Sequence, residues 1–198
     1  MLGVPTEDGH AFDGSPIPYT ADAISNAQPS ELLQVESWTG SGGYQLLPGK
    51  LYYNNTYKSL RFITGGNNLF YSVWCNGDKE FYDMVSDPDQ MQNRLGSDPP
   101  STNDTYYGRP QAELINRLDA VLLVGKSCKQ ESCRNPWITL FPSGEVSDLA
   151  GAMKAKYDSF FEDQPKVSFS SCKSCHLNLV ISLNSSDWQR RSARVHLV

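Results

Sequence analysis

Residues 57–84 decide the fold of this 198-residue chain, and their sequence is YKSLRFITGGNNLFYSVWCNGDKEFYDM. The stretch holds three runs rich in aromatic and β-branched residues, at 57–63, 69–75 and 79–84. Runs of this length and composition predict β-strands. Glycine and asparagine separate the runs, so we expect three strands rather than one long element.

The residues between these runs favour tight turns. Residues 65–68 read Gly-Gly-Asn-Asn, and Asn76-Gly77 is a dipeptide that tolerates the positive φ angles of short hairpins. The sequence therefore predicts a three-stranded antiparallel meander.

Helical patterns follow the strands. Asp87 and Pro88 resemble an N-cap followed by the first residue of a helix. Apolar residues recur at helical spacing at Leu114, Ile115, Leu118, Val121 and Leu122, and residues 147–161 carry a second apolar stripe. Strands followed by helices predict an α+β fold, in which a small antiparallel sheet packs with one or two amphipathic helices.

The chain divides into three parts by composition. Residues 1–50 are rich in Pro, Gly, Ser and Thr, with one short apolar patch at 32–35, and we expect an extended linker that wraps another surface. Residues 51–172 form the expected α+β subdomain. Residues 173–198 are expected to be a disordered tail.

Overall composition excludes several classes of protein. The chain is 39% hydrophobic and 20% charged, with a formal net charge of −5, which is typical of a globular protein. No basic stripe could follow a phosphate backbone, so we expect no nucleic-acid partner. No apolar run reaches the roughly 18 to 20 residues of a membrane span. The first residues, MLGVPTED, lack the basic start and apolar stretch of a secretory signal.

The five cysteines suit disulfides. Cys75 stands alone, Cys128 lies near Cys133, and Cys172 lies near Cys175. In the chain-entropy model, a bridge between Cys128 and Cys133 contributes about 2 kcal/mol, and one between Cys75 and Cys172 contributes about 4 to 5 kcal/mol. Cys175 is then left over.

Two metal sites are alternatives to disulfides. Residues 172–176, CKSCH, match the C-x-x-C-H pattern of covalent haem attachment, but only 22 residues follow to enclose a haem. Zinc would use Cys128 and Cys133 with Cys172 and Cys175, although the gap between the first two is at the edge of the usual range. Both alternatives are less favoured than disulfides.

Other candidate residues lie in polar, loop-like sequence. Three glycosylation sequons begin at Asn54, Asn103 and Asn184. The three histidines, His10, His176 and His196, are expected to be solvated rather than catalytic. The sequence contains no G-x-S-x-G, H-E-x-x-H, phosphate-binding or dinucleotide-binding motif. We therefore assign no catalytic, cofactor-binding or metal-binding residue to this chain.

The strand ending in Glu80-Phe81-Tyr82-Asp83-Met84 leads into Asp87-Pro88 and then Asn93. This pattern resembles the C-terminal subdomain of sulfatases, where Glu-Leu-Tyr-Asp-Leu leads into Asp-Pro and a turn ending in Asn. Further stretches resemble arylsulfatases of the fungal type, namely 57–61, 114–128, 133–137 and 157–169. The resemblance covers residues 1 to about 172, and the opening of the chain resembles the linker that follows the catalytic domain.

The resemblance implies a parent enzyme that hydrolyses sulfate esters outside the cytosol. Such enzymes use a formylglycine made from the Cys or Ser of C/S-x-P-S-R, beside a calcium ion held by aspartates. No cysteine of this chain begins that motif, and the chain has no Asp-Asp or Asp-Asn dipeptide. We therefore expect an inactive C-terminal fragment, begun at an internal methionine, whose partner is the parent's catalytic domain. The alternative is a non-catalytic secreted module that binds another protein.

Overall fold

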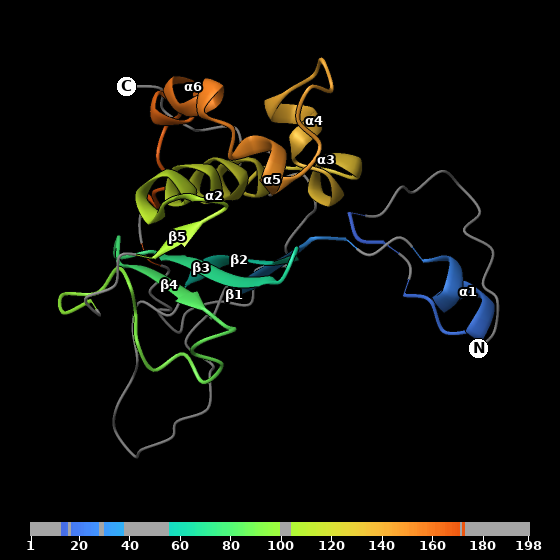
Figure 1. Cartoon of the computed structure of the whole chain (residues 1–198), viewed down its shortest axis with the longest axis horizontal. Coiled ribbons are helices and arrows are strands. Elements are labelled where there is room, and N and C mark those ends of the chain that lie inside the picture. The colour runs from blue at the N-terminus through green and yellow to red at the C-terminus, as the bar shows by residue number, and fades with distance from the viewer. Residues whose placement is uncertain are drawn as a thin grey trace, which may run out of the picture.

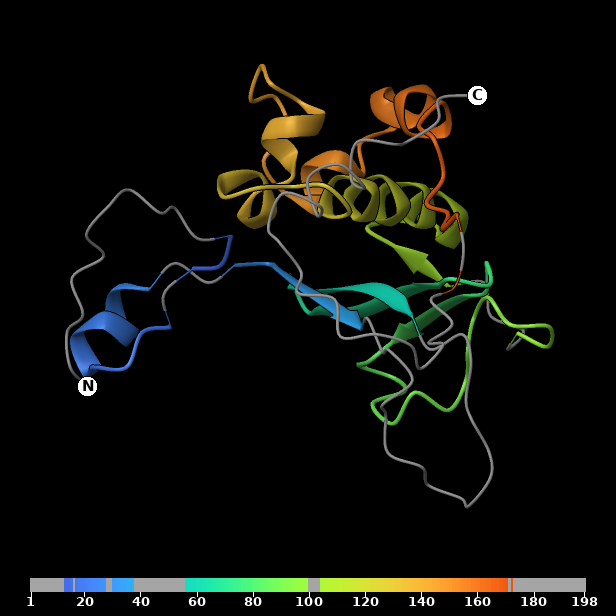
Figure 2. The ribbon, with the colours of Figure 1, turned by 180° about the vertical axis from the view of Figure 1, so that it is seen from behind.

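The computed structural model describes residues 13–15, 17–27, 30–37, 56–99, 104–170 and 172. These residues form a four-stranded sheet covered by helices on one face, as Figures 1 and 2 show from opposite sides, and a separate two-stranded sheet. The predicted α+β class is confirmed. The expected tail at 173–198 lies outside the described residues.

The sheet has four antiparallel strands in the order β1-β2-β3-β4. These are β1 Leu32–Ser37, β2 Tyr57–Thr64, β3 Asn67–Trp74 and β4 Lys79–Asp83. The predicted meander is therefore present as β2, β3 and β4. Strand β1 contains the short apolar patch at residues 32–35, which was expected to be part of an extended linker. It pairs along the whole of its length with β2.

Glycine makes both turns of the meander. Thr64 pairs with Asn67, so the first hairpin loop is only Gly65-Gly66, and both glycines have positive φ, at 57° and 84°. This is the two-residue hairpin whose twist matches the strands. In the second turn only Gly77 is left-handed, with φ 93°, and its N–H donates to the carbonyl of Trp74 at 3.0 Å.

Helix α2, Gln111–Gly125, covers one face of the sheet (Figure 1). It is the amphipathic helix predicted from the spacing of its apolar residues. Two short strands, β5 Thr105–Tyr106 and β6 Arg109–Pro110, lead into it. The core between helix and sheet consists of fully buried side chains, among them Leu60, Phe62, Tyr71, Phe81, Leu114, Leu118 and Val121.

Short helices complete this layer, and the second predicted helix is wrong as a continuous element. They are α3 Glu131–Arg134, α4 Trp137–Leu140, α5 Leu149–Ala152, the 3₁₀ helix η1 Ala155–Tyr157 and α6 Asp158–Glu162. The chain is extended at Lys154, with φ −65° and ψ 137°, which breaks the helix expected over 147–161. Leu149, Ala152, Met153, Tyr157 and Phe161 of that stretch are still buried, and Phe160 is partly buried against the same core.

The predicted helix start at Asp87 is also wrong. Residues 84–86 and 88–89 form turns, and Gln90 has a left-handed backbone with φ 55°. The Asp87 carboxylate accepts the N–H groups of Met91 and Gln92, both at 2.9 Å, so it caps a loop. A cap signal in sequence describes a carboxylate that satisfies nearby amides, which a loop provides as well as a helix.

Asp119 joins α2 to three other parts of the fold. Its side chain is 1% exposed. It accepts hydrogen bonds from the Tyr71 hydroxyl at 2.5 Å, the Lys79 ammonium at 2.9 Å and the Val167 amide at 2.8 Å. Burial, with the nearby Asp119 charge, raises the pKa of Tyr71 far above its ordinary value, so this hydroxyl remains a donor. The contact holds β3, β4, α2 and the segment after α6 together.

Arg117 of α2 performs the same role for the outer helices. It is fully buried, its Nε donates to the Ala152 carbonyl at 3.2 Å, and its Nη1 donates to Glu113 at 2.9 Å. Its Nη2 pairs with Asp158 of α6, and the guanidinium lies 4.7 Å from the centre of the Phe161 ring. The hydrogen bond from the Arg117 guanidinium lowers the pKa of Asp158. A buried guanidinium thus ties α5 and α6 to α2.

Asp119→Ala is expected to lower the free energy of unfolding by about 2 to 4 kcal/mol, because it leaves the buried Tyr71 hydroxyl and the partly exposed Lys79 ammonium without their acceptor. Urea denaturation measures the change. The control is Asp89→Ala, at an exposed position, which is expected to change stability by about 0.5 kcal/mol or less. A loss below about 1 kcal/mol for Asp119→Ala would show that the network is dispensable.

Candidate interaction surface

Two disulfides account for four of the five cysteines. Cys75 bonds Cys172, and Cys128 bonds Cys133. Neither pair therefore offers free thiolates to zinc, and Cys172 is not free for the haem pattern. Within the described ranges, no group of three or more His, Cys, Asp or Glu side chains could hold a metal ion.

The remaining candidates from the sequence cannot be placed. Outside the described residues lie Cys175, the three histidines His10, His176 and His196, and the sequons at Asn54, Asn103 and Asn184. Among the helices that the structure does describe, none is both long enough and apolar enough to span a membrane.

One segment projects from the body and contacts little of it. We call residues 17–27 the arm; it contains helix α1, Ala21–Asn26, and lies away from both sheet and helices in Figures 1 and 2. No residue of α1 is buried. Ile17 is 85% exposed, Tyr19 67% and Ile24 59%. Large apolar side chains gathered on one projecting segment are typical of an interaction site.

The arm is nevertheless locally structured. The Thr20 hydroxyl caps α1 by accepting the Ala23 N–H at 3.1 Å, and the side chains of Ser25 and Asn26 donate to the Asp22 carbonyl. Thr20 followed by Asp22 in the first turn is an N-terminal helix signal that can be seen in the sequence. Composition alone had suggested an extended segment.

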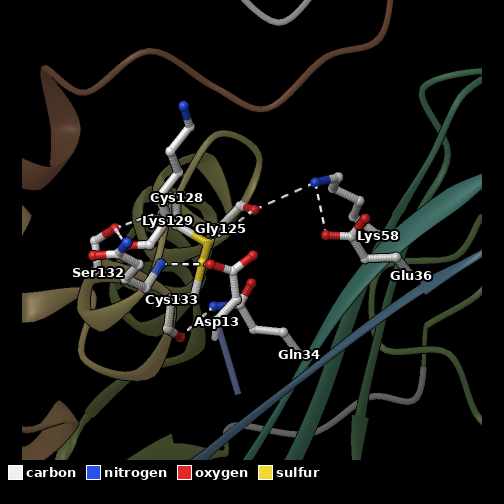
Figure 3. Close-up of a disulfide and its surroundings, with 10 residues drawn as sticks. Asp13, Gln34, Glu36, Lys58, Gly125, Cys128, Lys129, Ser132 and Cys133 are labelled. Carbon is white, nitrogen blue, oxygen red and sulfur yellow. Dashed lines mark hydrogen bonds and ion pairs between the residues drawn. A yellow bond between two sulfur atoms is a disulfide. The ribbon is translucent and has the colours of Figure 1, made fainter. Parts of the chain in front are cut away.

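The loop closed by Cys128 and Cys133 holds both flanks of the arm (Figure 3). Asp13, which precedes the arm, accepts the Gln130 backbone N–H at 2.5 Å. Gln34 of β1, which follows the arm, donates from its side-chain amide to the Cys133 carbonyl at 2.9 Å. We call residues 125–133 the base loop. It binds the residues on either side of the arm, Asp13 and Gln34, at neighbouring positions of one loop.

Strand β2 fixes the start of the base loop. The Lys58 ammonium lies at the carboxyl end of α2, 3.3 Å from the Gly125 carbonyl and 2.8 Å from Glu36 (Figure 3). A cation at this position interacts favourably with the helix dipole. Burial, followed by repulsion from Lys58, lowers the pKa of Lys126.

Glu31 provides a further attachment at the entry to β1. Its carboxylate accepts the Trp137 indole N–H at 2.8 Å and the Leu149 amide at 3.1 Å, so it links the sheet to α4 and α5. Burial raises the pKa of Glu31 despite these hydrogen bonds, and the charge of Asp148 acts in the same direction.

The sheet face opposite α2 is a second candidate surface. Leu33, Val35 and Ile63 are each about half-exposed on neighbouring strands, and Leu33 pairs with Arg61 in the register of β1 and β2. Phe70 and Tyr82 continue this row across the sheet, with ring centres 6.3 Å apart. An apolar edge strand beside aromatic residues suits contact with another protein surface.

The chain is similar to sulfatases over most of its length. It is 36% identical over 173 residues to a sulfatase of Metarhizium majus, which covers 87% of this chain and 32% of that protein. Arylsulfatases of Volvox carteri and Chlamydomonas reinhardtii are 28% and 27% identical, and each match covers 82% of this chain. No family model and no solved structure matches significantly.

The resemblance to sulfatases is therefore confirmed, with curated homologues of that name. The chain spans only 23% to 32% of the length of the relatives that it matches. Most of the length of those proteins has no counterpart in it.

The raised pKa of Glu31 predicts a pH effect with a definite sign. Because the fold binds the proton of Glu31 more tightly than the unfolded chain does, the contribution of Glu31 to stability is full below pH 4.5 and falls as the pH rises through the folded-state pKa. Glu31→Gln removes this term while keeping an oxygen that accepts the Trp137 N–H. Urea midpoints of both proteins between pH 4 and pH 7 should show the variant gaining stability relative to the parent as pH rises. A constant difference would contradict the prediction.

Proposed function

We propose that this chain is the C-terminal, non-catalytic part of an arylsulfatase-like sulfuric ester hydrolase, in which it packs on the catalytic part. The observation that carries the proposal is the match of over four-fifths of this chain to less than a third of each sulfatase. A region that is retained at this identity without most of the enzyme's length suits a subdomain that supports a larger body.

The residues of this chain do not fit the cofactors that sulfatases use. The sequence has no C/S-x-P-S-R motif from which formylglycine is made. The described residues also bring together no cluster of acidic groups for calcium. Formylglycine and calcium therefore belong, in this proposal, to the rest of the enzyme, and no residue of this chain takes part in the chemical step.

The proposal gives the sheet a structural role. The face of the sheet opposite α2 carries Leu33, Val35 and Ile63 and would pack on the catalytic part, which would remove these side chains from water. The two disulfides favour an oxidising compartment, so the parent enzyme would act outside the cytosol. Glycans on Asn54, Asn103 or Asn184 would be consistent with that location.

The arm favours a second candidate function. A projecting segment that exposes Ile17, Tyr19 and Ile24 would also serve a non-catalytic secreted module that binds a separate protein. The similarity to sulfatases makes the first candidate the stronger one, because it identifies what the exposed surfaces would contact.

The purified chain is expected to show no hydrolysis of an aryl sulfate above the buffer rate, with or without added calcium, because its sequence has no motif from which the formylglycine nucleophile is made. Release of the phenol, followed by absorbance, measures the activity. The full-length arylsulfatase of Volvox carteri serves as the positive control under the same conditions. Calcium-dependent turnover by this chain alone would overturn the assignment of catalysis to the remainder of the enzyme.

A further inference from the structure

We propose that the arm, residues 17–27, docks this chain onto the catalytic part of the sulfatase, and that the base loop closed by Cys128 and Cys133 holds the arm in position. This inference rests on the proposed function. It adds to the proposed function the segment that makes the contact and the loop that holds this segment in position.

The arm has the composition of a surface that is buried in a larger assembly. Ile17, Tyr19 and Ile24 are more than half exposed here, and Asp22 is its one charged residue. A six-residue helix is too short to be stable on its own, and no residue of α1 is buried by the part of the chain that the structure describes. A further contact with the arm would therefore stabilise a helix whose cap is already formed.

The base of the arm is built to keep its two flanks together. Asp13 and Gln34 are bonded to the backbone of Gln130 and Cys133, two positions of the same base loop. Gln130 adopts a left-handed backbone with φ 54°, in which its N–H is donated to Asp13. The disulfide closes this loop covalently, which restricts the conformations available to the two groups that bind Asp13 and Gln34.

Gly125 allows the close approach on which the base depends. A Cβ atom at this position would lie 2.4 Å from the side-chain oxygen of Gln34, well inside contact distance. A side chain at this position would therefore displace the Gln34 side chain, which reaches across the end of α2. Arm and base loop are far apart in the sequence, and the bond between Asp13 and Gln130 spans 117 residues.

The occupant is the catalytic part of the enzyme, because more than two-thirds of each relative's length lies outside the match. A single negative charge on the arm calls for an apolar, weakly charged surface on that part. The arm precedes β1 in the sequence, and that strand also exposes Leu33 and Val35. A second copy of this chain is the competing occupant, and the experiment distinguishes the two.

The test uses a full-length chimera, in which this chain replaces the matched region of the Metarhizium majus sulfatase. We would measure hydrolysis of a sulfate ester by the chimera, and the rate at which heat inactivates the chimera. Ile17→Asp with Ile24→Asp is expected to speed inactivation about tenfold, the change that loss of about 1.4 kcal/mol of contact energy produces. Limited proteolysis of the same variant should then cut within the arm.

Matched variants separate docking from general effects of added charge. Val85→Asp with Met91→Asp places the same charges at exposed apolar positions outside the arm, and it should inactivate at the rate of the parent chimera. Cys128→Ser with Cys133→Ser leaves the arm intact but opens the base loop, and it should inactivate at an intermediate rate.

Each outcome decides one of the two proposals. A chimera that has no activity contradicts the proposed function itself. An active chimera whose inactivation rate is unchanged by the arm substitutions overturns only the role of the arm. Sedimentation of the isolated chain decides the occupant: if it is a dimer that the arm substitutions dissociate, the arm binds a second copy. If Cys128→Ser with Cys133→Ser inactivates at the rate of the parent chimera, the disulfide does not hold the arm in position.

Discussion

The buried carboxylate of Asp119 is the contact on which the arrangement of the molecule depends. It lies between the helix and the sheet and is satisfied by a hydroxyl, an ammonium and a backbone amide from three other segments. A carboxylate in this position is costly unless every partner is in place, so it specifies one register of α2 over β3 and β4. Arg117, two residues earlier on the same helix, places the outer helices in the same way.

The core residues are thus fully packed, while part of the surface exposes apolar side chains. The core between α2 and the sheet is closed, and its central side chains are fully buried. The arm and the outer face of the sheet expose apolar side chains that the interior does not use. This asymmetry suits a subdomain that reaches its final environment beside a larger partner, and it agrees with the small share of the sulfatase relatives that the chain covers.

Local patterns predicted what local physics decides. The strands β2, β3 and β4 and the helix α2 follow from alternation, from the Gly-Gly and Asn-Gly turns and from helical spacing, all of which operate over a few residues. The break at Lys154 and the loop at Asp87 were not foreseen, because in both places the sequence is compatible with a helix and packing selects another backbone. Strand β1 was missed for a related reason, since a short apolar patch becomes a strand only when β2 offers an edge.

The sequence by itself determined the composition of the core, the meander with its two turns, the principal helix and the resemblance to sulfatases, because each depends on neighbours along the chain. The sequence by itself also contains no C/S-x-P-S-R motif and no Asp-Asp or Asp-Asn dipeptide. Only the tertiary structure decided that Asp13 and Gln34 meet at one disulfide-closed loop and that the arm stands clear of the body. These features join residues about a hundred positions apart, and their pairing is set by the folding of the intervening chain, which no short pattern records.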